Sequence, residues 1–172
     1  ALIMANGVAG NDEITGGGPG SDVFAAALTE ILLDLARMIV RDGEGATKLV
    51  RIQVEAAASD EDALLAARSV ATSALVKTAF FGEDANWGRI IAAVGYSGAA
   101  VDPDRVRILF DGVPMVEAGL GLGPDQEVLA TEVLKKPEFT VTIDLGLGDG
   151  KSYYYTSDLT YDYVRINAAY RT

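Results

Sequence analysis

The 172-residue sequence contains neither cysteine nor histidine, and these absences exclude several kinds of chemistry. Without cysteine there is no disulfide, no thiolate nucleophile and no cysteine zinc site, which fits a reducing compartment. Without histidine there is no Ser-His or Cys-His pair, and the commonest metal ligand is missing. Any catalysis in which this chain takes part must therefore use other groups.

Basic charge is also scarce, because 14 Lys and Arg stand against 25 Asp and Glu, for a net charge of −11. This balance argues against binding to nucleic acid, which requires a basic face, and against a polybasic membrane-surface role. No apolar run approaches the roughly 18 residues that a membrane span needs, and no signal peptide is recognisable. The aspartates match no metal-loop spacing, so we expect no metal site.

Apolar residues, in contrast, are abundant. They make up 49% of the chain before its 19 glycines are counted, which exceeds the usual share. We therefore expect the chain to bury surface against another chain as well as in its own core. Residues 1–5 look like the end of a buried strand, which predicts that the sequence begins inside a longer protein.

Helical periodicity predicts a long helix from Ser21, as its N-cap, to about Arg41, with Gly43 ending it. Its apolar positions form a stripe with a period of 3.6 residues and are Phe24, Leu28, Ile31, Leu32, Leu35, Met38 and Ile39. A helix capped by Ser59 should run to about residue 78, with Leu64 and Leu75 facing inward, and another should cover residues 87–94.

Strand patterns alternate over residues 49–55, 139–145 and 151–156. Asp111-Gly112 predicts a hairpin between residues 106–110 and 113–117. A short helix is expected at residues 126–134 and a helical or extended tail after residue 159. We expect the strands of the second half to be antiparallel, so the class is α+β rather than a doubly wound parallel sheet.

Two glycine-rich stretches suggest a nucleotide site at first sight. Gly150-Lys151-Ser152 resembles the end of a phosphate-binding loop, but Leu145 stands where that loop needs glycine, and a strand should follow instead of a helix. Residues 119–123 lack the third glycine of a dinucleotide fingerprint. We interpret both stretches as turns.

Three segments carry more unusual polar residues than turns require: residues 42–49, 75–89 and 157–172. In the first, the glycines on both sides of Glu44 would let the backbone approach a ligand and aim one carboxylate, although the pattern alone favours a solvated side chain. The pattern alone likewise favours a core position for Trp87, a helix cap at Asn167 and a frayed end at Thr172.

Together with residues 5–11, these segments resemble the ornithine acetyltransferase family, the bifunctional glutamate N-acetyltransferases of arginine biosynthesis. The resemblance rests on whole runs: Glu-Gly-Ala-Thr-Lys at 44–48, Leu-Val-Lys-Thr-Ala-Phe-Phe-Gly at 75–82, the stretch 86–98 that begins Asn-Trp-Gly-Arg, and the terminal Tyr-Arg-Thr. Ala85 departs from the pattern, because the family usually has proline there.

The resemblance implies an α+β fold with mixed or antiparallel sheets and packed helices. Residues 1–45 would belong to a stacked sandwich of the N-terminal-nucleophile type. Residues 46–172 would form a smaller C-terminal α+β domain whose tail returns to the active site. The chain would be the C-terminal part of a β chain, paired with an α chain in a cytoplasmic α2β2 heterotetramer.

The resemblance also implies the reaction, in which acetyl moves from N2-acetylornithine to glutamate through an acyl-enzyme. The nucleophile would be the N-terminal Thr that autocatalytic cleavage exposes. Because that Thr would lie upstream of Ala1, this chain should hold no catalytic residue and be inactive alone. No cofactor is implied, although some members accept acetyl-CoA as the acetyl donor.

By the same resemblance, Glu44, Asn167 and Thr172 bind substrate. Lys77, Asn86 and Arg89 are weaker candidates that could instead pin the fold. Two alternatives stay open. One is a related N-terminal-nucleophile amidase or secondary-metabolism acyltransferase, and the other is a non-catalytic scaffold that binds amino acids or a partner chain.

Overall fold

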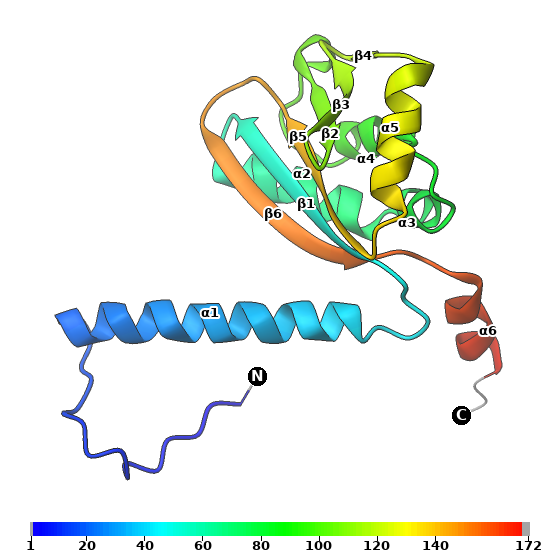
Figure 1. The fold of residues 1–172 in the computed structure, drawn as a ribbon. Coiled ribbons are helices and arrows are strands. Elements are labelled where there is room, and N and C mark those ends of the chain that lie inside the picture. The colour runs from blue at the N-terminus through cyan, green and yellow to red at the C-terminus, as the bar shows by residue number, and fades with distance from the viewer. Residues whose placement is uncertain (1, 170–172) are drawn as a thin grey trace. The chain divides into compact units, whose positions relative to one another are not determined.

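The computed structural model describes residues 2–169, apart from the side chain of Pro19 (Figure 1). The chain separates into a compact unit that ends at Ala36 and a second that begins at Arg37. Most of helix α1 (Pro19–Arg41) lies in the first unit, and the sheet lies in the second. The domain division predicted at residue 45 concerns a longer protein and stays a prediction.

The first unit differs from two expectations. Residues 2–5 are exposed and form no strand, because every strand within residues 2–169 begins at Leu49 or later. In α1, Ser21 lies inside the helix, and the predicted apolar stripe is largely exposed, with Phe24, Ile31 and Leu35 all about half accessible. Periodicity identified the apolar face of this helix correctly, but it carries no information about what covers that face.

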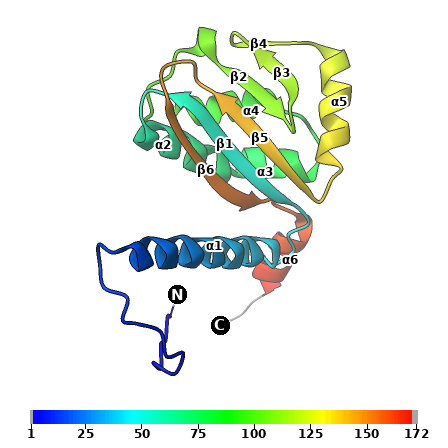
Figure 2. The ribbon, with the colours of Figure 1, turned by 60° about the vertical axis from the view of Figure 1, so that its left-hand side comes forward.

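The second unit is built on one six-stranded sheet within the described residues, ordered β4-β3-β2-β5-β1-β6 (Figures 1 and 2). The strands are β1 (Leu49–Ala57), β2 (Arg107–Phe110), β3 (Val113–Glu117), β4 (Leu120–Gly121), β5 (Glu138–Asp144) and β6 (Gly150–Ser157). β1 and β5 are parallel, and the other described neighbours are antiparallel. The predicted α+β class is confirmed.

The hairpin predicted at Asp111-Gly112 is confirmed, since β2 and β3 pair there and both turn residues have positive φ. The strands of the second half are antiparallel wherever they pair, as expected, but β5 and β6 do not pair with each other, because β1 lies between them and runs parallel to β5. The connection between those two strands crosses the end of β1, where Leu145 N donates to Glu55 O and Leu147 N to Ala56 O. β1 takes the inner position because its residues Val50, Ile52 and Val54 are completely buried.

The glycines of this connection are needed for different reasons. Gly146 has a φ of +63°, a conformation that favours glycine. At Gly150, an added Cβ would lie 2.3 Å from the backbone of Ser59, so this glycine allows a close approach of two chain segments. The interpretation of this stretch as a turn between strands, instead of a phosphate loop, is confirmed.

The helices of the second unit cover one face of the sheet and one of its ends (Figure 2). They are α2 (Asp60–Thr72), α3 (Ala74–Phe81), α4 (Trp87–Gly95), the 3-10 turn η1 (Pro103–Arg105), α5 (Pro124–Leu134) and α6 (Tyr161–Ala169). Ser59 caps α2 as predicted. The helix predicted to continue to residue 78 breaks at Ser73, which ends α2 and caps α3 through its hydroxyl.

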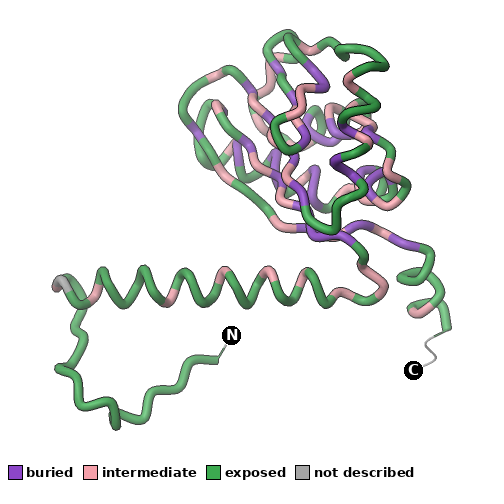
Figure 3. Tube along the Cα trace, viewed as in Figure 1, coloured by how far each residue is buried: buried purple, intermediate pink, exposed green. Residues whose placement is uncertain are grey.

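The core lies between the helices and the sheet (Figure 3). α2 packs on β1 and β6 through small residues, and its Ala63, Ala67 and Val70 are completely buried. Leu64 and Leu75, expected to face inward, are exposed. Leu64 lies on α2 outside the face formed by the three buried residues, and Leu75 lies on α3, after the break at Ser73.

None of the described helices is both long and apolar enough to cross a membrane. Only α2 and α3 taken together reach the necessary length and composition, and they are bent by 59° at their junction.

Candidate functional site

The three polar segments singled out in the sequence lie together in the second unit. Residues 42–48, here called the site loop, connect α1 to β1. The segment 157–160, here called the clasp segment, runs from the end of β6 to the start of α6. The clasp segment contacts the site loop on one side and α3 on the other, where Leu159 N donates to Lys77 O over 3.1 Å.

Asp158 joins the clasp segment to the far end of the site loop. Its Oδ1 accepts from Thr47 N at 2.8 Å and from Lys48 N at 3.0 Å, and its Oδ2 accepts from Thr47 Oγ1 at 2.5 Å. The Asp158 side chain is only 3% exposed. A buried carboxylate is stable in the protein when several donors satisfy it, and here the loop supplies three.

Thr160 joins the clasp segment to the middle of the site loop. Its hydroxyl donates to Gly45 O over 2.7 Å and accepts from Tyr163 N over 3.1 Å, which caps α6. Gly45 has a φ of +67°, and an added Cβ would lie 2.7 Å from Tyr163 N. The loop backbone therefore lies directly against the first turn of α6.

Glu44 and Asn167 meet as a result of this packing. The Asn167 Nδ2 group donates to Glu44 Oε2 over 3.0 Å and to Tyr163 O over 2.9 Å. Both side chains are exposed, so a ligand could reach them. Asn167 lies inside α6, so the interpretation as a helix cap, drawn from the pattern alone, is wrong. The predicted site residue Thr172 lies outside the described residues.

Lys77 lies next to the clasp segment, on α3. Its Nζ donates to Ser157 Oγ at 3.4 Å. Burial lowers the pKa of Lys77 below its ordinary value, and the charge of Asp158 opposes part of that effect. Lys77 thus contacts the clasp segment from α3, on the side away from the site loop.

Asn86 and Arg89 make contacts within the helical layer. The Asn86 side chain caps α4 by accepting from Arg89 N at 3.1 Å. Arg89 Nη1 donates to Leu75 O at 2.8 Å and to Thr78 Oγ1 at 3.3 Å, which joins α4 to α3. These contacts agree with the alternative that both residues pin the fold.

Trp87 packs against the core, as the sequence pattern favoured. Gly121 approaches its indole so closely that an added Cβ would lie 2.7 Å from Cζ2.

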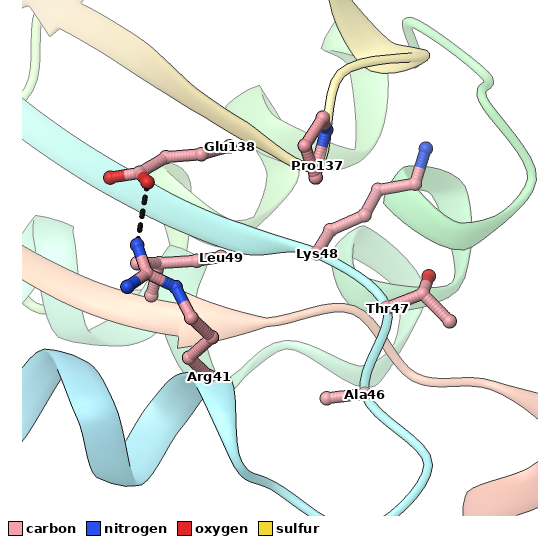
Figure 4. Close-up of a pocket in the computed structure, with 7 residues that line it drawn as sticks. All are labelled: Arg41, Ala46, Thr47, Lys48, Leu49, Pro137 and Glu138. Atoms are coloured by element: carbon pink, nitrogen blue, oxygen red, sulfur yellow. Dashed lines mark hydrogen bonds and ion pairs between the residues drawn. The ribbon is translucent and has the colours of Figure 1, made fainter.

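A small cavity of about 270 Å³ opens beside the site loop (Figure 4). Arg41 and Glu138 face each other across it, with Nη2 and Oε2 2.7 Å apart. Lys48, which also lines the cavity, is 7% exposed and directs its Nζ to Leu134 O and to Glu83 Oε1. The charged side chains around this cavity thus have protein partners.

A wider cleft of about 570 Å³ lies between α5 and the turn that precedes α4, and its rim is acidic. Its charged lining consists of Glu83, Asp84, Glu127 and Glu132. In the described part of the chain, no group of three or more acidic side chains is arranged to hold a metal ion.

The sequence analysis missed the residues that assemble this site. Thr160 could have been found, because a threonine three positions before Tyr163 fits an N-cap. Nothing in the local pattern distinguishes the buried Asp158 from aspartates that are solvated, since its three hydrogen-bond donors are more than 100 positions away in the sequence.

Known proteins match this chain over its whole length. The ArgJ family model covers residues 1–172. The chain is 66% identical over 171 residues to the arginine biosynthesis bifunctional protein ArgJ of Syntrophotalea carbinolica, which covers 99% of this chain and 44% of that protein. It is 62% identical over 172 residues to the Geobacter sulfurreducens protein of the same name, covering 100% and 44% respectively.

A solved structure agrees with these matches. The crystal structure of arginine biosynthesis bifunctional protein argJ from Bacillus halodurans aligns with a TM-score of 0.92 at 42% identity, covering 98% of this chain and 79% of that chain. The chain spans less than half the length of the curated relatives.

Proposed function

Because this chain belongs to the ArgJ family, we propose that it is the substrate-binding part of the β chain of a glutamate N-acetyltransferase. The enzyme, also called ornithine acetyltransferase, would move acetyl from N2-acetylornithine to glutamate. The observation that carries the proposal is the contact between Glu44 and Asn167, two residues implied in substrate binding that lie far apart in the sequence.

The chemistry proposed for the complete enzyme explains why this chain needs neither histidine nor cysteine. An N-terminal Thr, contributed by β-chain residues that precede this chain, attacks the acetyl carbonyl with its own α-amine as base, and ornithine leaves. The amine of glutamate then attacks the acetyl-enzyme, forms N-acetylglutamate and regenerates the Thr hydroxyl. Oxyanion donors would come from the α chain.

Within this scheme, Glu44 binds the ammonium group of the ornithine side chain. Charge-assisted hydrogen bonds of this kind contribute about 1.5–3 kcal/mol. Asn167 orients the carboxylate by donating to its Oε2, and the Asn167 carbonyl can accept from a substrate amide. Thr172 would supply a hydroxyl donor to the substrate carboxylate or amide. Lys77, Asn86 and Arg89 remain weaker candidates.

The proposed assembly is a cytoplasmic α2β2 heterotetramer formed after autocatalytic cleavage of one precursor. Its first domain would be a stacked sandwich of the N-terminal-nucleophile type. The exposed apolar stripe of α1 supports a role in packing against other parts of that assembly, since exposed apolar faces mark interaction surfaces. No cofactor is proposed, and acetyl-CoA is retained as an alternative acetyl donor.

The test is acetyl transfer from N2-acetylornithine to labelled glutamate, measured for the full-length protein and for the isolated 172-residue chain. We expect the full-length protein to be active and the isolated chain to be inactive. Mass spectrometry of the active preparation should find an α chain and a β chain that begins with Thr.

Other outcomes would favour the alternatives. Hydrolysis of amides without transfer to glutamate would favour a related amidase. Binding of amino acids without turnover by the full-length protein would favour a scaffold. Transfer by the rigorously purified isolated chain would refute the placement of the nucleophile outside it.

A further inference from the structure

We propose that Asp158 and Thr160 are positioning residues for this reaction, and that together they hold the site loop against α6 so that Glu44 meets Asn167. This inference rests on the proposed function and assigns roles to two residues of the clasp segment. Neither side chain needs to contact substrate, since both act through the loop.

The site loop requires such a restraint because of its own composition. Gly43 and Gly45 flank Glu44, and glycine gives the backbone more conformational freedom than any other residue. An exposed carboxylate on such a loop would sample many positions, and fixing it in solution would cost conformational entropy. A loop fixed in advance lowers that cost at the moment of binding.

Asp158 supplies the restraint at the end of the loop. It accepts two backbone N–H groups and one hydroxyl from Thr47 and Lys48. Because Asp158 is buried, water cannot readily replace it, and its loss would leave the Lys48 N–H group, itself buried, without an acceptor.

Thr160 supplies the restraint in the middle of the loop and links it to the helix. One hydroxyl donates to Gly45 O and accepts from Tyr163 N, so a single side chain fixes the residue after Glu44 and the first turn of α6. Tyr163 in turn offers its carbonyl to Asn167. The path from Thr160 therefore reaches both members of the Glu44–Asn167 pair.

The chain offers a closely matched control for Thr160. Thr156 is 6% exposed and Thr160 is 4% exposed, and each hydroxyl donates to a backbone carbonyl over 2.7 Å. Thr156 Oγ1 donates to Ala71 O, on α2, and over 3.3 Å to the adjacent Ser157 O, and not to the site loop. T160V and T156V each remove a buried hydroxyl that donates to a backbone carbonyl over 2.7 Å, but T160V also removes the acceptor of Tyr163 N, and only T160V removes a bond to the site loop.

The experiment compares T160V, T160S and T156V in the full-length enzyme by steady-state kinetics and thermal melting. We expect T160V to lower kcat/KM for N2-acetylornithine about tenfold, the equivalent of one hydrogen bond. T160S should restore most of the activity. T156V should lower the melting temperature less than T160V, because Thr160 also caps α6, and it should leave kcat/KM near the parent value.

A double-mutant cycle tests whether Thr160 acts through Glu44. In an E44Q background, T160V should lower kcat/KM less than in the parent, because the group that it positions has lost its charge. The inference would be overturned if the effects of T160V and E44Q on kcat/KM were fully additive. Equal losses of kcat/KM in T160V and T156V, or an unchanged kcat/KM in T160V, would overturn it as well.

Two further measurements keep the test decisive. If T160V does not fold, T47V removes the bond to Asp158 from the exposed side of the same contact and should lower kcat/KM to a smaller extent. If the parent enzyme transfers no acetyl, the proposed function fails, and crystal structures still test the positioning. The Asn167 Nδ2 to Glu44 Oε2 distance should then lengthen in T160V and not in T156V, and an unchanged distance would overturn the inference.

Discussion

The side-chain amide of Asn167 donates a hydrogen bond to Glu44 Oε2 over 3.0 Å, across 123 positions of the sequence. The pair is exposed, whereas the residues that bring its two segments together are buried. The accessible Glu44 and Asn167 are thus held in place by hydrogen bonds that the buried Asp158 and Thr160 make.

Replacing Glu44 with glutamine should impair use of N2-acetylornithine without unfolding the chain. The loss of one charge-assisted contact should lower kcat/KM by a factor equivalent to about 1.5–3 kcal/mol. D42N is the matched control, because it removes the same charge from the same loop. Equal kinetic effects of E44Q and D42N would return Glu44 to the status of a solvated loop residue.

Deleting Arg171 and Thr172, which lie outside the described residues, should lower acetyl transfer by the full-length enzyme about tenfold. The melting temperature should not change, because α6 is fixed at its start by Thr160 and by the contact of Tyr161 with Phe81, whose ring centroids are 5.5 Å apart. T172S should keep most of the activity and T172V should not. Full activity after the deletion would support a frayed terminus.

The aromatic and apolar side chains of the tail are expected to anchor it: Tyr161, Tyr163, Val164, Ile166 and Tyr170, the last of which lies outside the described residues. Of the expected anchors, Tyr161, Tyr163 and Val164 are exposed in the described chain. The start of the helix is held by the hydrogen bonds of Thr160 and by the ring contact between Tyr161 and Phe81, and residues 2–169 do not bury Tyr163 and Val164 as expected.

Gly45→Ala should destabilise the second unit more than Gly98→Ala. Both glycines have positive φ, at +67° and +85°, which costs a residue with a Cβ roughly 1–2 kcal/mol. Only at Gly45 would the new Cβ meet backbone, whereas nothing lies within 4 Å at Gly98. Urea unfolding followed by Trp87 fluorescence measures the difference. Equal losses would show that the loop and α6 can separate at little cost.

Lys77→Met should stabilise the chain near neutral pH, and the gain should shrink at high pH. Burial lowers the pKa of Lys77 in the folded chain below 10.5, so the folded state binds this proton less tightly than the unfolded state. The charged amine therefore opposes folding below the folded pKa, and this opposition disappears as the pH rises from the folded pKa to 10.5. The free energy of unfolding measured across this range, with the exposed K151M as control, tests the sign. A gain that grows with pH would contradict it.

Much of the local structure could be predicted because its causes are local. The Asp111-Gly112 turn, the Ser59 cap and the alternation of β1 each depend on residues within a few positions of one another. The same holds for the periodicity of α1, although not for its burial. Glu44 is a site candidate only through the family resemblance of its run, because the local pattern alone favours a solvated side chain, and its role stays a prediction.

The sequence by itself therefore determined the chemistry that this chain can offer, the type of most elements and the residues that resemble a family. The tertiary structure decided that β1 separates β5 from β6, that Asp158 is buried, and that Glu44 faces Asn167. The strand order depends on backbone pairing between distant strands, and the other two features depend on side-chain hydrogen bonds between residues more than 100 positions apart. Such contacts have no periodicity or local motif, and they arise only when the buried faces of strands and helices have brought distant segments together.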